Sequence, residues 1–161
     1  MKKLVTMSVF GAALIFGFNA NAQTGQGGWL IGGSSAISYS STDNGFSTSS
    51  VFLMDMKAGY FVAENLNLGL SFGYLDFDGS TLTTIGPFAR YYINGGFFLG
   101  AGYESQSSGG ENASLLNLEG GYPIFINDNV AIEPGITYAI GLGDYDGLST
   151  FAFGVGFTFY F

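Results

Sequence analysis

Six charged residues lie within alternating segments of the sequence rather than in its turns, and they are the side chains best placed to do chemistry. In each segment the charge falls on the parity opposite to the large apolar residues. Because successive side chains of a strand point to opposite faces, the pattern predicts that all six share one enclosed face of a sheet. They are Asp55, Lys57, Arg90, Glu104, Glu119 and Glu133.

Four acids and two bases in one enclosed space predict a network of ion pairs, because buried charges need partners. We expect Lys57 and Arg90 to bridge the acids. Two functions are then open. One is a filled polar interior that fixes strand register, which the narrow interior of an eight-stranded barrel favours. The other is a conduit that prefers cations because acids outnumber bases, and the many glycines on the same face favour it by leaving room for water.

Catalysis finds little support in the residue types. The chain contains no His and no Cys, so the usual nucleophile and base pairs are excluded. Glu104 and Glu119 could in principle do acid–base work, but a salt network explains them sooner. We therefore expect no enzymatic activity, no catalytic residue, no cofactor and no resident metal.

Two Asp-x-Asp-Gly segments, at 76–79 and 144–147, resemble the start of an EF-hand calcium loop. The remaining ligands of that motif are absent. Acids and glycine in this order also form tight turns, which is the interpretation we favour, and whether these segments bind a cation stays open.

Eight segments of alternating polarity, separated by turn residues, predict eight strands and no helix. Asn94-Gly95 is expected to form a hairpin turn, and 41–47 and 105–112 are expected to be polar loops. Pro87, Pro123 and Pro134 fall inside predicted strands, where a missing N–H donor predicts bulges or broken ladders. The expected strands cover about 28–39, 48–62, 66–74, 80–93, 97–104, 116–124, 130–140 and 148–161.

The last segment is the most regular. From Phe151 to Phe161 every second residue is Phe or Val, and the residues between them are mostly Gly, Ala and Thr, with no charge on either face. A strand of this length with a large apolar face suits a tilted membrane strand, which needs about 9–11 residues. Together the segments predict an all-β, eight-stranded antiparallel up-and-down barrel that crosses a membrane, with aromatic girdles at both ends. A soluble lipocalin-like barrel is the alternative, but it would need a charged exterior.

The N-terminus predicts export. Met1-Lys2-Lys3 is followed by an apolar stretch too short to span a bilayer and by Ala20-Asn21-Ala22, the pattern of a cleaved signal peptide. We therefore divide the chain into a signal peptide, 1–22, and a barrel domain, 23–161. Cleavage leaves Lys57 and Arg90 as the only bases against twelve acids, which disfavours nucleic acid binding.

The chain end carries a resemblance to a known group of proteins. Gly156, Phe159 and the terminal Phe161 resemble the C-terminal signal by which the insertion machinery recognises bacterial outer-membrane barrels, although Gly154 stands where that pattern often has a polar residue. Across the mature chain the architecture resembles the OmpX-like, OmpA-like and OmpW-like eight-stranded barrels.

This resemblance implies a location in the cell outer membrane, with both termini in the periplasm. It implies lipid, lipopolysaccharide and the insertion machinery as partners, and we expect a monomer. Such families include structural tethers, surface-interaction proteins and porin-like small-solute channels. The fold therefore leaves a structural or surface-interaction role and a narrow channel for small cations or solutes both open.

Overall fold

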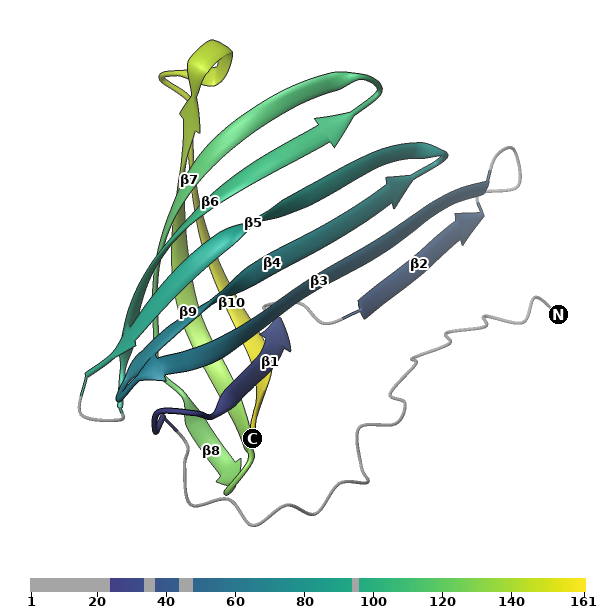
Figure 1. The fold of residues 1–161 in the computed structure, drawn as a ribbon. Helices are drawn as coiled ribbons and strands as arrows, with labels where there is room; N and C mark the ends of the chain where they lie inside the picture. Colours follow the sequence, from purple (N-terminus) through teal and green to yellow (C-terminus); the bar gives the residue numbers. More distant parts are fainter. Residues whose placement is uncertain (1–23, 34–36, 44–47, 94–95) are drawn as a thin grey trace, which may run out of the picture.

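The computed structural model describes residues 24–33, 37–43, 48–93 and 96–161. Ten β-segments and one short 3-10 helix follow one another along the chain (Figure 1). Within this part of the chain, no helix has the length and apolar character needed to cross a membrane. The elements are β1 Trp29–Gly33, β2 Ile37–Asp43, β3 Thr48–Ala63, β4 Leu66–Phe77, β5 Ser80–Tyr92, β6 Phe98–Ser108, β7 Glu111–Gly121, β8 Ile124–Asn127, β9 Val130–Leu142, η1 Gly143–Tyr145 and β10 Ser149–Tyr160.

The ten segments form an eight-stranded antiparallel barrel. β1 and β2 pair with successive parts of β3, and β7 and β8 pair with successive parts of β9, so each of these two pairs acts as one strand. Apart from the β1–β10 pair, every other pair of neighbours in the sheet is also adjacent in sequence. β1 pairs with β10 on one side and β3 on the other, which closes the barrel. The predicted all-β fold is therefore confirmed.

The barrel is apolar outside and polar or aromatic inside, as the alternation predicts. In β10 the odd-numbered residues face outward, and Phe153 is 70% exposed. The even-numbered Thr158 and Tyr160 are buried in the interior. Exposed rings also circle the end at which β1 begins and β10 ends, which we call the terminal end. These rings belong to Trp29, Tyr60, Tyr91, Phe97, Tyr122 and Phe161.

The opposite end, which we call the loop end, has tighter turns than the sequence suggested. Asp78-Gly79 and Gly109-Gly110 each join two strands as two-residue turns, and all four residues have positive φ. That geometry matches the right-handed twist of the flanking strands. The expected polar loop at 105–112 is therefore wrong, because β6 and β7 continue through it. β2 likewise continues to Asp43, into the loop expected at 41–47.

The three prolines lie where the strand ladders are interrupted. Between β5 and β6 the ladder skips Gly86 and Pro87 without changing register. Tyr122 and Pro123 separate β7 from β8, and the carbonyl of Pro134 still accepts a hydrogen bond from Tyr122 N at 3.0 Å. Pro134 has no N–H to donate, and this side of its backbone faces the gap between β7 and β8. The expectation of locally broken ladders is met at these sites.

Several expectations concern residues that lie outside the described ranges. They are the signal peptide, residues 1–22, the Asn94-Gly95 turn, and residues 44–47 of the expected first loop.

Candidate functional site: ion pairs and cavities in the barrel interior

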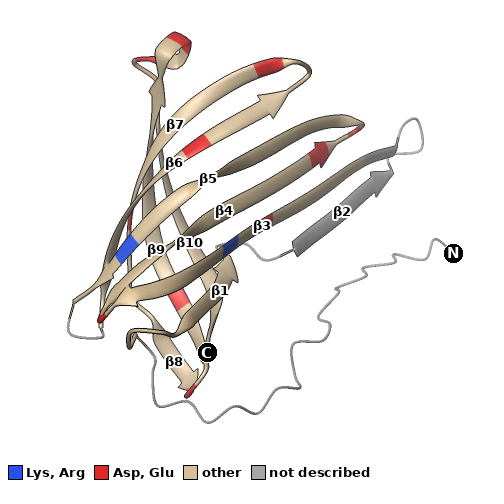
Figure 2. Ribbon diagram, in the orientation of Figure 1, with Lys and Arg blue, Asp and Glu red and all other residues tan. Residues whose placement is uncertain are grey.

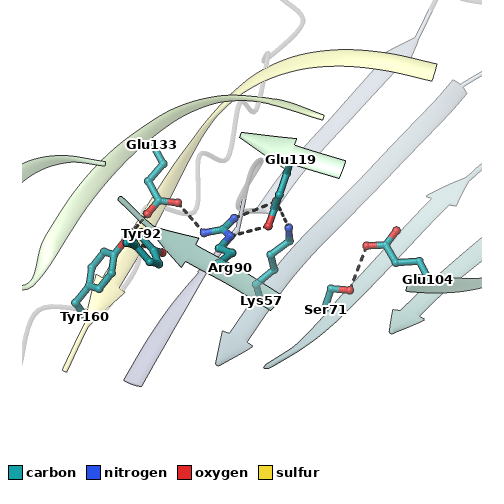
Figure 3. A network of polar contacts seen from close by, with 8 residues as sticks. All are labelled: Lys57, Ser71, Arg90, Tyr92, Glu104, Glu119, Glu133 and Tyr160. Carbon is teal, nitrogen blue, oxygen red and sulfur yellow. Dashed lines mark hydrogen bonds and ion pairs between the residues drawn. The ribbon is translucent and has the colours of Figure 1, made fainter. Parts of the chain in front are cut away.

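Four of the six predicted charges meet in the interior near the terminal end. They come from β3, β5, β7 and β9, and Figure 2 shows the strands that carry them. Arg90 contacts Glu119 with two nitrogens, Nε to Oε1 at 2.7 Å and Nη2 to Oε2 at 3.2 Å. Its Nη1 lies 3.1 Å from Glu133 Oε2, and Lys57 Nζ lies 2.5 Å from Glu119 Oε2 (Figure 3). We call these four residues the ion-pair network.

A glycine makes the Arg90–Glu119 pair possible. Arg90 and Glu119 both lie opposite Gly100, one on each neighbouring strand. A Cβ on Gly100 would lie 2.7 Å from both Cγ and Oε1 of Glu119. The bare backbone at this position therefore leaves the space through which the guanidinium and the carboxylate meet.

The network is nearly removed from solvent and balanced in charge. Arg90 is 7% exposed and Glu133 6%. Its two cations face two carboxylates, which meets the requirement that buried charges be paired. The guanidinium carbon of Arg90 also lies 4.2 Å from the ring centroid of Phe98, within the range of a cation–π contact. The arrangement fixes four strands relative to one another.

Asp55 and Glu104, the other two predicted charges, lie outside this network. Glu104 Oε1 lies 3.1 Å from Ser71 Oγ, which is equally close to the carbonyl oxygen of Gly86. The single hydroxyl proton of Ser71 can serve only one of these acceptors at a time. The Oδ1 atom of Asp55 is buried and has no hydrogen-bond partner among the residues the structure describes. No base in the described ranges lies within ion-pair distance of either acid.

An aromatic cluster fills the interior between the network and the terminal end. Its rings are almost completely buried, and neighbouring centroids lie 5.5 to 6.4 Å apart. Tyr160 O–H donates to Glu133 Oε1 at 2.5 Å, and the Tyr92 and Tyr160 hydroxyl oxygens lie 3.1 Å apart, so the cluster is bonded to the network (Figure 3). We use the name aromatic cluster for the rings of Phe61, Tyr92, Phe98 and Tyr160. Leu30 belongs to the same buried cluster, and the ring of Phe88 lies beside Lys57 and Arg90 of the network.

Sequence reasoning did not assign a role to this cluster, although a signal was present. Phe88, Arg90 and Tyr92 share one parity of β5, and Tyr160 shares the parity of the small residues in β10. Large rings on an inward parity indicate a position where the interior is filled rather than open. The signal was the side of the strand on which these rings lie, combined with their nearness to the strand ends.

Described residues line two cavities that border the predicted charges. One, of about 150 Å³, lies beside the ion-pair network against the small residues Gly135, Gly154 and Gly156. The other, of about 470 Å³, lies toward the loop end and is lined by Asp55 and Glu104 among others. Lys57 contributes to the lining of both. The larger of these two cavities therefore lies on the loop-end side of the network.

The two Asp-x-Asp-Gly segments are built as turns. Asp76 Oδ1 accepts a hydrogen bond from Gly79 N at 3.3 Å, and Asp78 Oδ1 accepts one from Ser50 N at 2.7 Å. In the second segment, Asp144 lies in η1 and Asp146 N donates to Gly143 O at 3.1 Å. Backbone donors thus occupy the carboxylates of the first segment.

The residues of the predicted insertion signal lie at the end of β10. Gly156 is buried and pairs with Glu133, whereas Phe159 pairs with Val130. Phe161 is exposed, and its ring stacks on that of Phe159 with centroids 6.5 Å apart. The two rings form one apolar surface on the barrel exterior.

Comparison with known proteins supports the fold. No family model matches the sequence, and no curated protein is similar to it. The N-terminal β-barrel domain of Pseudomonas aeruginosa OprF aligns with a TM-score of 0.55 at 19% identity, over 85% of this chain and 99% of that domain. The outer membrane protein OprG from Pseudomonas aeruginosa aligns with a TM-score of 0.47 at 16% identity, over 85% and 97% of the two chains. By its similarity to the OprF domain, the chain has the fold of an eight-stranded outer-membrane β-barrel domain.

Proposed function

We propose that the protein is an integral outer-membrane barrel with a largely filled interior and a structural or surface-interaction role. The observation that carries this proposal is the aromatic cluster, whose buried rings lie across the interior at the terminal end. A solute that crossed the barrel would have to displace these rings. It would also have to separate ion pairs whose breaking, by loss of one partner, costs about 3–5 kcal/mol.

The exterior supports a lipid environment. Large apolar side chains are exposed on β1 and on every strand from β3 to β10, an exterior that water would not favour. We propose outer-membrane lipid and lipopolysaccharide as its surroundings, a monomer as the working form, and periplasmic termini. Phe159 and Phe161 would be read by the insertion machinery. No catalytic activity, cofactor or nucleic acid partner forms part of the proposal.

A narrow channel for small cations is the second candidate. The cavity of about 150 Å³ beside the network supports it, because glycines of β9 and β10 leave space next to the ion pairs. Water in that space would provide a path past the charges, and the surplus of inward acids would favour cations. The aromatic cluster would then have to move for the path to reach the terminal end.

Planar-bilayer conductance of the refolded mature protein separates the two candidates, with folding checked in the same sample by heat-dependent gel mobility. We expect folded wild-type protein to give no conductance steps. A variant with both Tyr92→Ala and Tyr160→Ala should conduct, because it removes two rings of the aromatic cluster. The matched control carries Tyr91→Ala and Tyr122→Ala, which remove two exposed exterior rings.

Cation-selective steps from the wild-type barrel that change with Glu119→Gln and Glu133→Gln would instead establish the channel. A silent Tyr92→Ala, Tyr160→Ala barrel would show that the aromatic cluster is not what closes the interior.

A further inference from the structure

The cavity of about 470 Å³ on the loop-end side of the network is lined by charged residues outside the ion-pair network. We call it the vestibule. Its walls come from the inner faces of β3, β6, β7, β9 and β10, and the segment from η1 to β10 contributes Tyr145 and Leu148. The volume is within the range of small-molecule sites, about 300–1,000 Å³.

The vestibule carries an unbalanced negative charge. Asp55 and Glu104 line it, and both lie close enough to each other for their charges to interact. Lys57 also lines it, but its ammonium group is bonded to Glu119 at the network. Neither carboxylate therefore has a base of the described chain within ion-pair distance, although Lys57 lies close enough to Asp55 for their charges to interact.

These carboxylates lack donors as well as counter-charge. Oδ1 of Asp55 is buried with no partner in the described structure, and Glu104 competes with the Gly86 carbonyl for one hydroxyl proton. A buried acceptor without a donor is costly. A ligand that supplies N–H donors and positive charge would satisfy both needs.

The lining combines polar side chains, among them Gln106, Asn117 and Thr137, with an apolar part. The apolar part includes Leu115, Ala139 and Ala152. Burial against this apolar surface stabilises a bound aliphatic chain, but it does not stabilise a bound inorganic ion.

The spacing of the two acids favours a ligand with more than one charge. Asp55 is on β3 and Glu104 on β6, with β4 and β5 between them. The Glu104 carboxylate nevertheless reaches across β5 to Ser71 of β4, the strand next to β3, so the two carboxylates lie nearer to each other than their backbones do. A flexible chain with several ammonium groups separated by a few methylene groups can contact both carboxylates at once.

We propose that the vestibule binds a linear aliphatic polyamine, with Asp55 and Glu104 each receiving one ammonium group and the apolar lining covering the methylene chain. This goes beyond the role of the barrel proposed above. It is tested by binding rather than by conductance, so either proposal can fail without the other.

The test is isothermal titration calorimetry on the full mature barrel, refolded in an uncharged detergent at about 0.15 M salt, which screens diffuse counterion attraction. The probes are spermidine, butylamine as a one-headed amine, and Mg²⁺. We expect spermidine to bind at least tenfold more tightly than butylamine or Mg²⁺. Asp55→Asn and Glu104→Gln should each weaken spermidine binding about tenfold, the loss of one charge-assisted contact.

Two further variants separate a built pocket from general negative charge. Glu64→Gln makes the same charge change in the exposed turn between β3 and β4 and should leave binding unchanged. Ala139→Leu fills the vestibule without changing charge and should weaken binding at least tenfold. If one acid variant fails to refold, the other acid variant and Ala139→Leu carry the test.

The proposal is overturned if folded wild-type protein gives no saturable heat with spermidine. It is also overturned if Mg²⁺ binds as tightly as spermidine, or if Glu64→Gln weakens binding as much as Glu104→Gln, since charge alone would then explain the effect.

Discussion

The two halves of the barrel interior treat charge in opposite ways. Near the terminal end, two bases and two acids are joined in the ion-pair network and sealed by the aromatic cluster. Toward the loop end, Asp55 and Glu104 face a cavity without a basic partner in the described chain. Inward-facing charged side chains therefore hold strands together in one half of the interior and line open space in the other. An inward acid forms an ion pair where a base lies close to it and a neighbouring glycine leaves space for the two side chains to meet.

The largest effect is predicted for the loss of Arg90, which contacts both acids of the network. Arg90→Met should lower the free energy of unfolding by about 3–5 kcal/mol, because Glu119 and Glu133 lose a buried counter-charge. Urea titration of the refolded barrel, followed by tryptophan fluorescence and gel mobility, measures it. A loss below about 1 kcal/mol would mean that water already solvates the network, which would make the two halves alike.

A smaller effect is expected at the glycine that lets the network form. Gly100→Ala should cost about 1–3 kcal/mol, since its Cβ would press on Glu119 at 2.7 Å. Gly120→Ala is the matched control, because its Cβ would find ordinary contacts, the nearest at 3.5 Å. Urea titration compares the two variants. Equal losses would show that the cost comes from strand backbone rather than from the network.

The bond between the cluster and the network should contribute less. Tyr160→Phe removes the hydroxyl that donates to Glu133 and contacts Tyr92, and we expect a loss of about 1–2 kcal/mol. Tyr122→Phe changes an exposed ring at the same end of the barrel and should be neutral. The same unfolding measurement applies to both. A neutral Tyr160→Phe would separate the aromatic cluster from the network energetically.

The smallest effect belongs to the vestibule. Glu104→Gln should change the free energy of unfolding by less than about 1 kcal/mol in the absence of ligand, because no ion pair is broken. A loss comparable to that of Arg90→Met, in the same titration, would mean that Glu104 stabilises the fold and that the two halves do not differ.

The strands and their inward faces could be predicted from the sequence because side-chain direction in a strand has a period of two. That rule assigned an interior position to all six charges. Which of them meet could not be predicted, since it depends on the register between strands. Glu119 contacts Arg90 because both lie opposite Gly100, and it also contacts Lys57 of β3. Glu104, on the same face of β6, lies four residues further along and contacts neither.

The loop at 105–112 shows a second limit of the pattern. Its Ser, Gln and Asn residues have the composition of a loop, yet Gly109 and Gly110 make a two-residue turn and the flanking polar residues pair. Polar composition at a strand end does not distinguish a long loop from strands that extend beyond an apolar belt. Turn chemistry was the better guide at this site.

The five-residue strand β1 has a consequence for how the barrel assembles. Its contacts with β3 join nearby parts of the chain, but its pairing of Leu30 with Tyr160 joins residues near the two chain ends. Contacts of such long sequence separation carry the greatest loop-closure entropy and tend to form late. The other neighbours can form first as hairpins, leaving a curved open sheet with β10 at its edge. Ring closure is then the step that a slow refolding phase would report, and shortening or weakening β1 would slow that phase.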